Sequence, residues 1–320
     1  MARTQRNRAP AVLAIGELNV DVVASGLRSA PELGRELIAP GLAVTLGSAT
    51  AIFACQIRKL GHPVRFIARV GKDAFGDTCL RALKDAGIDT KGVLRGSVGT
   101  GVTLSMSARN DRAQVTYLGA IAELCERDVP RNVFSGQKHL HLSSFELQRG
   151  LRPAFARLFR GARQHGLSTS FDPNSTLTGA TRAAVLDLVQ HVDLLFLNEL
   201  EARELSGQRD LRRALALLAR NTRGVIIKRG ARGALASLDG VQGESRAFDA
   251  RAIDTTGAGD SFAAGFVSAF LRGEALDECL REGNACGAAS TEQLGGTTGQ
   301  LDRAGLKRRL SAAARVAVQS

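Results

Sequence analysis

The sequence predicts an α/β fold, with a mostly parallel central sheet flanked by helices and a small β-sheet lid. Short apolar segments alternate with amphipathic ones along most of the 320 residues, which is typical of a parallel sheet covered on both faces. Two segments, 25–45 and 94–119, lack the helical period and contain β-like stretches. We expect them to meet as a small second sheet over the cleft at the carboxyl ends of the main strands.

Each element of the main sheet follows from a local pattern. The expected strands are short apolar segments: Val12–Gly16, Val64–Ala68, His139–Leu142, Leu167–Phe171, Val192–Leu197, Gly224–Lys228 and Gly233–Ser237. The expected helices have an amphipathic period: Ala49–Leu60, Phe75–Ala86, Leu151–His165, Arg182–Gln190 and Asp210–Asn221. We expect residues 11–320 to form one domain after a disordered, Arg-rich tail at residues 1–10.

The composition excludes several classes of function. Lys and Arg number 43 against 31 Asp and Glu, a formal charge of +12, but the excess is spread thinly. Aromatic residues are only 4%, with no Trp, and leave few platforms for stacking bases. No apolar run approaches the roughly 20 residues that span a bilayer, and no signal peptide is visible. We expect a cytoplasmic protein that binds neither nucleic acid nor membrane.

The strongest chemical signal is Asp254-Thr-Thr-Gly-Ala-Gly-Asp-Ser-Phe262, followed by an apolar helix to Leu271. Gly257 and Gly259 let an anion approach backbone N–H groups, and a helix start adds unbonded donors and the positive end of a dipole. The pattern predicts a phosphate cradle, with Asp260 beside it as a base for an attacking hydroxyl. The alternative is that Asp260 only complements the helix dipole.

The segment Asp254–Phe266 closely resembles the C-terminal signature of the ribokinase-like (PfkB) carbohydrate kinases, and the resemblance extends from about Val12 to about Arg309. It implies ATP-dependent transfer of a γ-phosphoryl group to a sugar hydroxyl, with ATP and Mg²⁺ as cofactors. By this resemblance Asp260 is the base, and the N–H groups of Gly257, Ala258 and Gly259 form the anion hole. Asp254 and Thr256 match backbone positions that hold a monovalent cation such as K⁺ in some relatives.

The resemblance also implies a substrate pocket near the first strand. Asn19 and Asp21 match positions that bind substrate hydroxyls, Gly47 would lie beneath the sugar, and Glu146 and the Asp172-Pro173-Asn174 turn would face the cleft. The family signature has Gly-Gly and then Asn, where this chain has Leu46-Gly47 and Ala51, so the substrate cannot be copied from ribokinase. Taken alone, residues 16–21 also suit an ordinary polar turn.

Three further matches point to the nucleotide. Asn198 and Glu201 resemble an Asn-x-x-Glu motif associated with phosphate and magnesium, with Glu201 acting through water; an acidic helix start is the alternative. The segment Lys228–Gly233 resembles the nucleotide loop through Gly230 and Gly233, although many relatives have Thr at Lys228; a β-hairpin turn is the alternative. Asn284 matches a position near adenine.

Several functional hypotheses remain open. A kinase acting on ribose or ketose sugars is favoured, with a nucleoside kinase, a sugar-acid kinase of the 2-keto-3-deoxygluconate type, or a non-catalytic sensor on the same fold as alternatives. A Rossmann dehydrogenase and a Walker-type NTPase are disfavoured because their glycine motifs are absent. The exposed edges of a lid sheet favour a homodimer formed through the lid.

Overall fold

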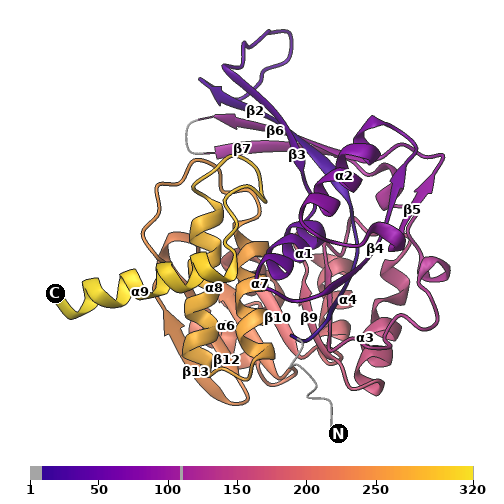
Figure 1. The fold of residues 1–320 in the computed structure, drawn as a ribbon. Helices are drawn as coiled ribbons and strands as arrows, with labels where there is room; N and C mark the ends of the chain where they lie inside the picture. Colours follow the sequence, from indigo (N-terminus) through magenta and orange to yellow (C-terminus); the bar gives the residue numbers. More distant parts are fainter. Residues whose placement is uncertain (1–8, 109–110, 320) are drawn as a thin grey trace, which may run out of the picture.

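The computed structural model describes residues 9–108 and 111–319, and its main body is a nine-stranded sheet with the order β13-β12-β11-β10-β9-β8-β1-β4-β5 (Figure 1). Pairing is parallel from β11 to β5, whereas β12 and β13 join antiparallel at one edge. The predicted, mostly parallel sheet is therefore confirmed. Its strands are β1 (Val12–Ile15), β4 (Val64–Gly71), β5 (Val93–Gly96), β8 (His139–Ser143), β9 (Ser168–Asp172), β10 (Leu194–Asn198), β11 (Gly224–Lys228), β12 (Ala234–Leu238) and β13 (Val241–Ser245).

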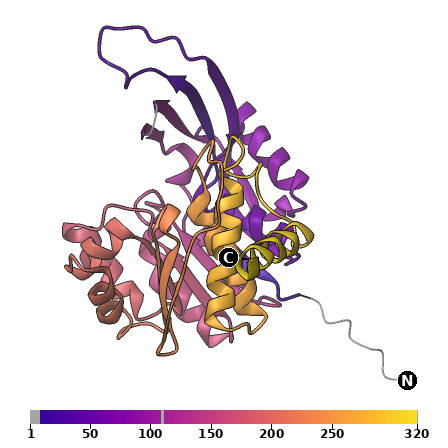
Figure 2. The same ribbon diagram turned by 90° about the vertical axis from the view of Figure 1, so that its left-hand side faces the viewer.

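A second, four-stranded sheet stands above the carboxyl ends of the main strands (Figure 2). It consists of β2 (Asn19–Leu27), β3 (Gly41–Leu46), β6 (Gly101–Ala108) and β7 (Asp111–Tyr117), in the order β3-β2-β6-β7. The central pair β2–β6 is parallel and the outer pairs are antiparallel. The predicted small sheet is confirmed, and we call it the lid sheet.

The lid sheet differs in detail from the two predicted segments. Strand β2 begins at Asn19, directly after the polar turn that follows β1. Residues 28–40 contain no strand, because Pro31, Gly34 and Pro40 interrupt the extended pattern. Residues 94–96 pair with β4 in the main sheet instead. Of the expected basic tail, residues 1–8 lie outside the described residues, and the Pro10 carbonyl accepts a hydrogen bond from His62 Nδ1 at 2.9 Å.

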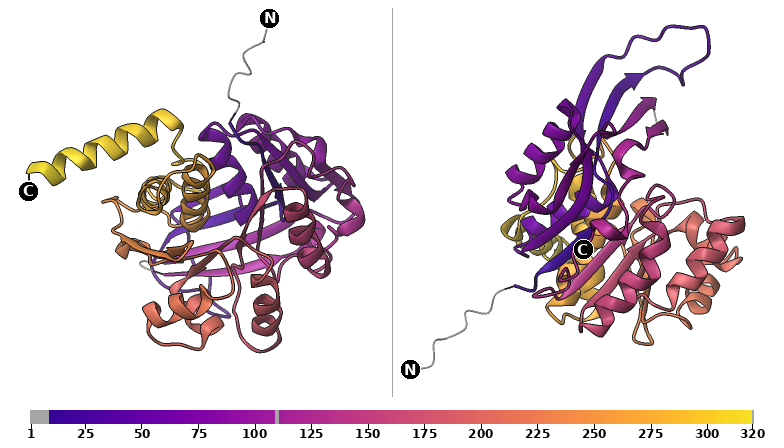
Figure 3. Two further views of the ribbon diagram at one scale, coloured as in Figure 1. Left: turned by 90° about the horizontal axis from the view of Figure 1, so that it is seen from below. Right: turned by 90° about the vertical axis from the view of Figure 1, so that its right-hand side faces the viewer.

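Helices cover both faces of the main sheet (Figure 3). Alternate residues of β10 show why: Leu195 and Leu197 pack into the cluster with α3 to α6, whereas Leu194 and Phe196 pack against α1, α7 and α8. The helices are α1 (Ala49–Lys59), α2 (Ala74–Asp85), α3 (Phe155–Gln164), α4 (Gly179–Val189), α5 (Glu199–Ser206), α6 (Leu211–Leu218), α7 (Ala258–Leu271), α8 (Leu276–Ser290) and α9 (Arg303–Gln319). Short 3₁₀ turns are η1 (Thr90–Gly92), η2 (Gly119–Ile121), η3 (Glu126–Asp128), η4 (Arg152–Ala154) and η5 (Gly230–Arg232). No described helix is long and apolar enough to cross a membrane.

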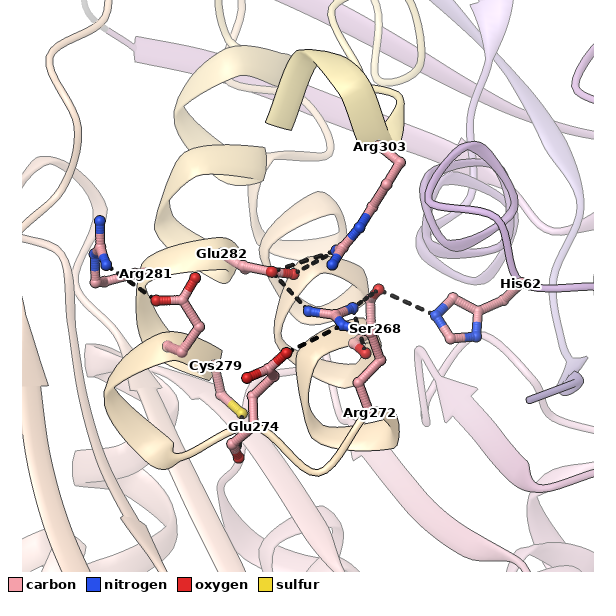
Figure 4. A network of polar contacts seen from close by, with 9 residues as sticks. His62, Ser268, Arg272, Glu274, Cys279, Arg281, Glu282 and Arg303 are labelled. Carbon is pink, nitrogen blue, oxygen red and sulfur yellow. Dashed lines mark hydrogen bonds and ion pairs between the residues drawn. The ribbon is translucent and has the colours of Figure 1, made fainter. Parts of the chain in front are cut away.

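A partly buried ionic network fixes the carboxyl end of α7 (Figure 4). Arg272 donates to the Ser268 carbonyl at 2.7 Å and to Glu282 at 2.6 Å, and Arg303 donates to the same carboxylate at 3.2 Å. His62 Nε2 lies 3.1 Å from Ser268 Oγ. The network joins α7, α8, α9 and the turn before β4, so the helix that carries the predicted phosphate cradle is anchored at its far end.

Two histidines of β8 are held neutral inside the sheet. His139 contacts Ser168 Oγ at 2.8 Å and Ser170 Oγ at 2.7 Å, and His141 stacks on Phe53 with ring centroids 3.7 Å apart. Burial lowers the pKa of His139 to about 3 and the pKa of His141 well below its usual value. Protonation of either ring therefore favours the unfolded chain.

This arrangement predicts a pH-dependent stability. Below pH 6.5 the unfolded chain binds a proton at residue 139 and the folded chain does not, so stability is present above that pH and is lost as pH falls toward 3. In His139→Gln, the slope of unfolding free energy against pH should decrease by about 1.4 kcal/mol per pH unit between about pH 6 and 4. Urea unfolding across that range measures the slope. His165→Gln, at an exposed position, is the control, and equal slopes in all three proteins would contradict the assignment.

Candidate active site

The start of α7 is an open set of backbone donors at the carboxyl end of the main sheet. Gly257 is the N-cap with φ of 72°, and no side chain caps the helix. A Cβ at Gly257 would lie 2.8 Å from Ile52 Cγ2 and 3.0 Å from Gly296 Cα, so both conformation and space require glycine. Within the described residues nothing accepts from the N–H of Gly257 or Gly259, whereas Ala258 donates to the Thr255 carbonyl at 3.3 Å. Two of the three predicted anion-hole donors are therefore open to a ligand.

The Asp260 carboxyl lies in the first turn of α7, beside these donors. Its Oδ1 accepts a hydrogen bond from Asn174 Nδ2 at 3.4 Å, which joins it to the predicted turn after β9. Burial, with the negative charge of Asp172, raises the pKa of Asp260 to about 7. If Asp260 only complemented the helix dipole, its anion would be stabilised and its pKa would be lowered. The raised pKa instead suits a proton acceptor that works near neutral pH.

Lys228 faces the same point from the sheet. It is the last residue of β11, and its ammonium forms an ion pair with Asp172 at the end of β9, across β10. A Cβ built on Gly259 would lie 3.1 Å from Lys228 Nζ, so the missing side chain at Gly259 makes room for this cation. Burial lowers the pKa of Lys228, but the charges of Asp172, Glu201 and Asp260 outweigh it and raise the pKa above its usual value.

Glu201 forms the acidic helix start that was one of its two predicted roles, and its association with magnesium stays a prediction. It belongs to a capping box at the start of α5, where Glu201 N donates to Asn198 Oδ1 at 2.9 Å and Glu201 Oε2 accepts from Asn198 N at 2.7 Å. Its other oxygen accepts from Ser175 N at 3.1 Å. Burial, followed by the charge of Asp172, raises the pKa of Glu201 to about 7. The residue caps a helix and contributes charge to the cluster.

A second group of polar residues lies where β2 meets α1. Asn19 Nδ2 donates to Asp21 Oδ1 at 3.1 Å and to Thr103 Oγ1 at 3.3 Å. A Cβ on Gly47 would overlap the Asp21 carboxylate, so Gly47 touches both predicted substrate-binding residues. Thr116 Oγ1 lies 3.1 Å from Thr103 Oγ1 and extends this series of hydrogen bonds to β7. The two threonines were not predicted, although their alternation with apolar residues in the lid strands marks them as one polar face.

Glu17 was also missed, and it joins the two groups. Its buried carboxylate accepts five hydrogen bonds: from Thr50 N and Oγ1 at 3.1 and 2.7 Å, Ser144 Oγ at 2.7 Å, Gln148 Nε2 at 3.2 Å and Ser143 Oγ at 3.5 Å. These donors come from the start of α1, from the last residue of β8 and from the segment that follows β8. Glu17 thus fixes the start of α1, and its charge contributes to the raised pKa of Asp260.

The remaining predicted residues lie apart from these contacts. Gly230 and Gly233 form the η5 connection between β11 and β12, so the hairpin reading of this segment is structurally right. Asn284 is buried, and its amide donates to the carbonyls of Ser245 at 3.3 Å and Arg246 at 3.1 Å. The Glu146 carboxylate accepts from Thr181 Oγ1, and its place in the substrate pocket stays a prediction.

Asp254 ties the loop before α7 to the segment before α9. Its carboxylate accepts from Thr256 N and Oγ1 at 2.9 and 2.7 Å and from Gly295 N at 2.9 Å. A cavity of about 320 Å³ between β2 and this loop includes Asp254 and Ile253 in its wall. A larger cavity of about 900 Å³ is lined by residues such as Pro10, Lys138 and Arg223 and contains none of the predicted site residues.

The geometry brings a helix start with open N–H groups, a carboxyl group with a raised pKa and a group of polar side chains on the lid strands to one end of the fold. The model of the pfkB family of carbohydrate kinases matches residues 9–303. The chain belongs to the pfkB family of carbohydrate kinases. The predicted family is confirmed, and the chain is an enzyme of the carbohydrate kinase type.

Relatives with curated names support this membership over most of their length. The 2-dehydro-3-deoxygluconokinase of Bacillus subtilis (strain 168) is 30% identical over 282 residues, which cover 83% of this chain and 87% of that enzyme. Fructokinase-2 of Oryza sativa subsp. japonica is 28% identical over 305 residues, with 89% of each chain covered. A solved E. coli structure described as ribokinase II, in complex with ATP and Mg²⁺, has a TM-score of 0.83 at 25% identity and covers 95% of this chain and 99% of its own.

The contact between Gly47 and Asp21 predicts a substrate-binding defect in this carbohydrate kinase. In Gly47→Ala the new methyl group displaces the Asp21 carboxylate, so KM for the sugar should rise at least about tenfold, equivalent to about 1.4 kcal/mol. KM for ATP should change less than twofold. Steady-state kinetics on the sugar that the wild type phosphorylates measures both. Gly96→Ala, where a Cβ meets nothing closer than 4.0 Å, is the control, and an unchanged sugar KM in Gly47→Ala would remove this contact from the pocket.

Proposed function

We propose that this carbohydrate kinase transfers the γ-phosphoryl group of ATP to a sugar hydroxyl, with Asp260 as the general base. The observation that carries the proposal is a carboxyl group with a pKa of about 7 next to two open N–H groups at a helix start. A bond from the sugar oxygen to the γ-phosphorus forms as the bond to the leaving ADP oxygen breaks. The hydroxyl proton goes to the Asp260 carboxylate, and the N–H groups of Gly257 and Gly259 stabilise the charge on the phosphoryl oxygens.

The proposed nucleotide site lies between the segment 228–233, the start of α7 and Asn284. The E. coli relative solved with ATP and Mg²⁺ supports these cofactors. Among the described residues no cluster of three His, Cys, Asp or Glu side chains could hold a metal ion. A Mg²⁺ would therefore be held by the phosphates and by water molecules, and Glu201 and Asn198 would hydrogen-bond those water molecules. The bound ion would neutralise charge on the phosphates. Because the Asp254 carboxylate already accepts hydrogen bonds from Thr256 and Gly295, K⁺ would use the carbonyl groups of Asp254 and Thr256.

The substrate pocket is proposed to lie between Asp21, Asn19 and Gly47, with the threonines of the lid sheet above it. A carboxylate and an amide suit adjacent hydroxyl groups, which supports a ribose or ketose substrate, and the fructokinase relative agrees. A sugar acid is the second candidate, because the Bacillus relative is a 2-dehydro-3-deoxygluconokinase. A non-catalytic sensor is opposed by Asp260, whose raised pKa would be of no use in a site that only binds. We place the reaction in the cytoplasm.

The proposed base has two kinetic consequences. On whichever of fructose, ribose, 2-dehydro-3-deoxygluconate and adenosine the wild type phosphorylates, Asp260→Asn should lower kcat at least about 10²-fold. In the wild type, kcat/KM should fall as pH decreases through about 7, because the protonated acid cannot accept the hydroxyl proton. ATP affinity and melting temperature should stay near wild type, since Asn also suits a helix start.

The control for this variant is Asp77→Asn, an aspartate in the first turn of α2 that forms an ion pair with Arg95. It should retain full activity. A fully active Asp260→Asn enzyme would show that Asp260 serves the helix and not the reaction.

We also propose that two copies associate through the lid sheet. Register places Val44, Val22, Leu104 and Val115 side by side across its four strands, and Val44, Leu104 and Val115 are 48%, 47% and 59% exposed. An apolar row of this kind on a sheet with open edges is typical of an interaction surface. A second copy of the same sheet matches it in chemistry.

Light scattering behind size exclusion tests this association. The wild type should have twice the 33.8 kDa mass of one chain, and Leu104→Glu should have the mass of one chain, because a carboxylate in the centre of the row would be buried unpaired. Val241→Glu, at an exposed apolar position of β13, should behave as wild type. A wild type with the mass of one chain would exclude the dimer.

A further inference from the structure

The site contains more carboxyl groups than cations, and one lysine connects them. The positive charge of Lys228 lowers the pKa of Asp172, of Glu201 and of Asp260. Among the described residues it is the single cation that acts on all three. The Lys228 side chain is 12% exposed and the Asp172 side chain 1%. A charge this enclosed keeps its electrostatic strength, because water screens it little.

The position of the Lys228 ammonium relative to α7 is the second observation. The place where Gly259 would carry a Cβ is 3.1 Å from Lys228 Nζ, so the ammonium lies directly beside the turn whose open N–H groups face the ligand. Lys228 reaches this point from the last position of β11, whose backbone is held by pairing with Asn198 of β10. A phosphoryl group bound by Gly257 and Gly259 would therefore lie next to a fixed ammonium.

We infer that Lys228 is a catalytic residue that contacts the phosphoryl group during its transfer, and that Asp172 is the positioning residue that holds its ammonium beside the start of α7. The inference rests on the proposed function, because it assumes that ATP binds at this helix start. Lys228 stays protonated throughout and exchanges no proton. It stabilises the negative charge that spreads over the oxygens of the transferring group, the task that N–H donors and cations perform in such sites.

The ion pair with Asp172 suggests how this cation is kept ready. Without nucleotide, the ammonium is neutralised by Asp172, so it is not buried alone. The phosphate offers the same ammonium a second anionic partner, and Lys228 has three N–H donors to share between them. A lysine that served only to neutralise Asp172 would not need to lie beside Gly259. The position of the ammonium beside Gly259 therefore favours a catalytic role for Lys228 over a purely structural one.

Binding measurements distinguish the two roles without relying on turnover. In Lys228→Met the affinity for the non-hydrolysable ATP analogue AMP-PNP should fall about tenfold, the loss of one charged contact of about 1.4 kcal/mol, whereas ADP affinity should change less than twofold. Isothermal titration in the presence of Mg²⁺ measures both. Equal weakening of AMP-PNP and ADP would overturn the inference, because the contact would not involve the terminal phosphate. Arg212→Met, which removes an exposed cation of α6 that pairs with Glu244, should affect neither.

Kinetics provide the second readout. Lys228→Met should lower kcat about 10²-fold or more, the scale for loss of one donor to a developing anion, and should move the acid limb of kcat/KM to higher pH, because the Lys228 charge lowers the pKa of Asp260. Lys228→Arg keeps the charge and should leave that limb in place. The double variant Asp172→Asn with Lys228→Met removes both charges together. Activity restored in the double variant would show that Lys228 only neutralises Asp172.

The outcomes also separate this inference from the proposed function. A wild type that transfers no phosphoryl group from ATP would refute the function itself. A wild type that does so, with a Lys228→Met variant equally active, would refute only the role of Lys228. Lys228→Met alone could fail to fold, because Asp172 is left without its partner. In that case the affinities for AMP-PNP and ADP are compared in the double variant. If the double variant prefers AMP-PNP over ADP as strongly as the wild type does, the inference is overturned.

Discussion

Concentrated negative charge at the start of α7 is the constraint on which the rest of the site depends. The charge of Asp172 acts on Glu201 and Asp260, the charge of Glu17 acts on Asp172 and Asp260, and the pKa of Glu201 and of Asp260 is raised to about 7. Like charges brought together out of water raise each other's pKa. The same crowding that makes Asp260 a useful base would repel the phosphates of ATP. Lys228, the open N–H groups of α7 and the proposed Mg²⁺ act together to offset that repulsion.

The fold keeps this arrangement rigid by anchoring α7 at both ends. At its start, Gly257 packs against Ile52 and Gly296, and the Asp254 carboxylate holds the preceding loop to Gly295. At its far end, Arg272 joins Glu282 in the partly buried network of Figure 4. Donors that are already oriented need no reorganisation when charge develops on a substrate. The stability of the helical layer and the chemistry at its edge are therefore linked through a single helix.

The local structure at the start of α7 could be predicted from sequence because it lies in one continuous segment. Two glycines, an aspartate and an apolar helix are adjacent in the chain, and strand–helix alternation placed them at the edge of a parallel sheet. The lid sheet was also predictable, although Pro31, Gly34 and Pro40 shortened its strands. Glu17 could not be recognised, because its hydrogen-bond donors come from residues 50, 143, 144 and 148. Glu146 was assigned to the cleft for its strand-end position, and that assignment stays a prediction. Its contact with Thr181 could not be predicted, because the sequence pattern did not place that helix beside it.

The central claim, that phosphoryl transfer takes place at the start of α7, is tested most directly by a crystal structure with Mg²⁺, AMP-PNP and the sugar that the enzyme phosphorylates. We expect the terminal phosphate to accept hydrogen bonds from the N–H groups of Gly257 and Gly259. We also expect one sugar hydroxyl to lie within hydrogen-bond reach of the Asp260 carboxylate, about 2.6–3.2 Å. A terminal phosphate bound away from this helix start, or a sugar with no hydroxyl near Asp260, would contradict the account.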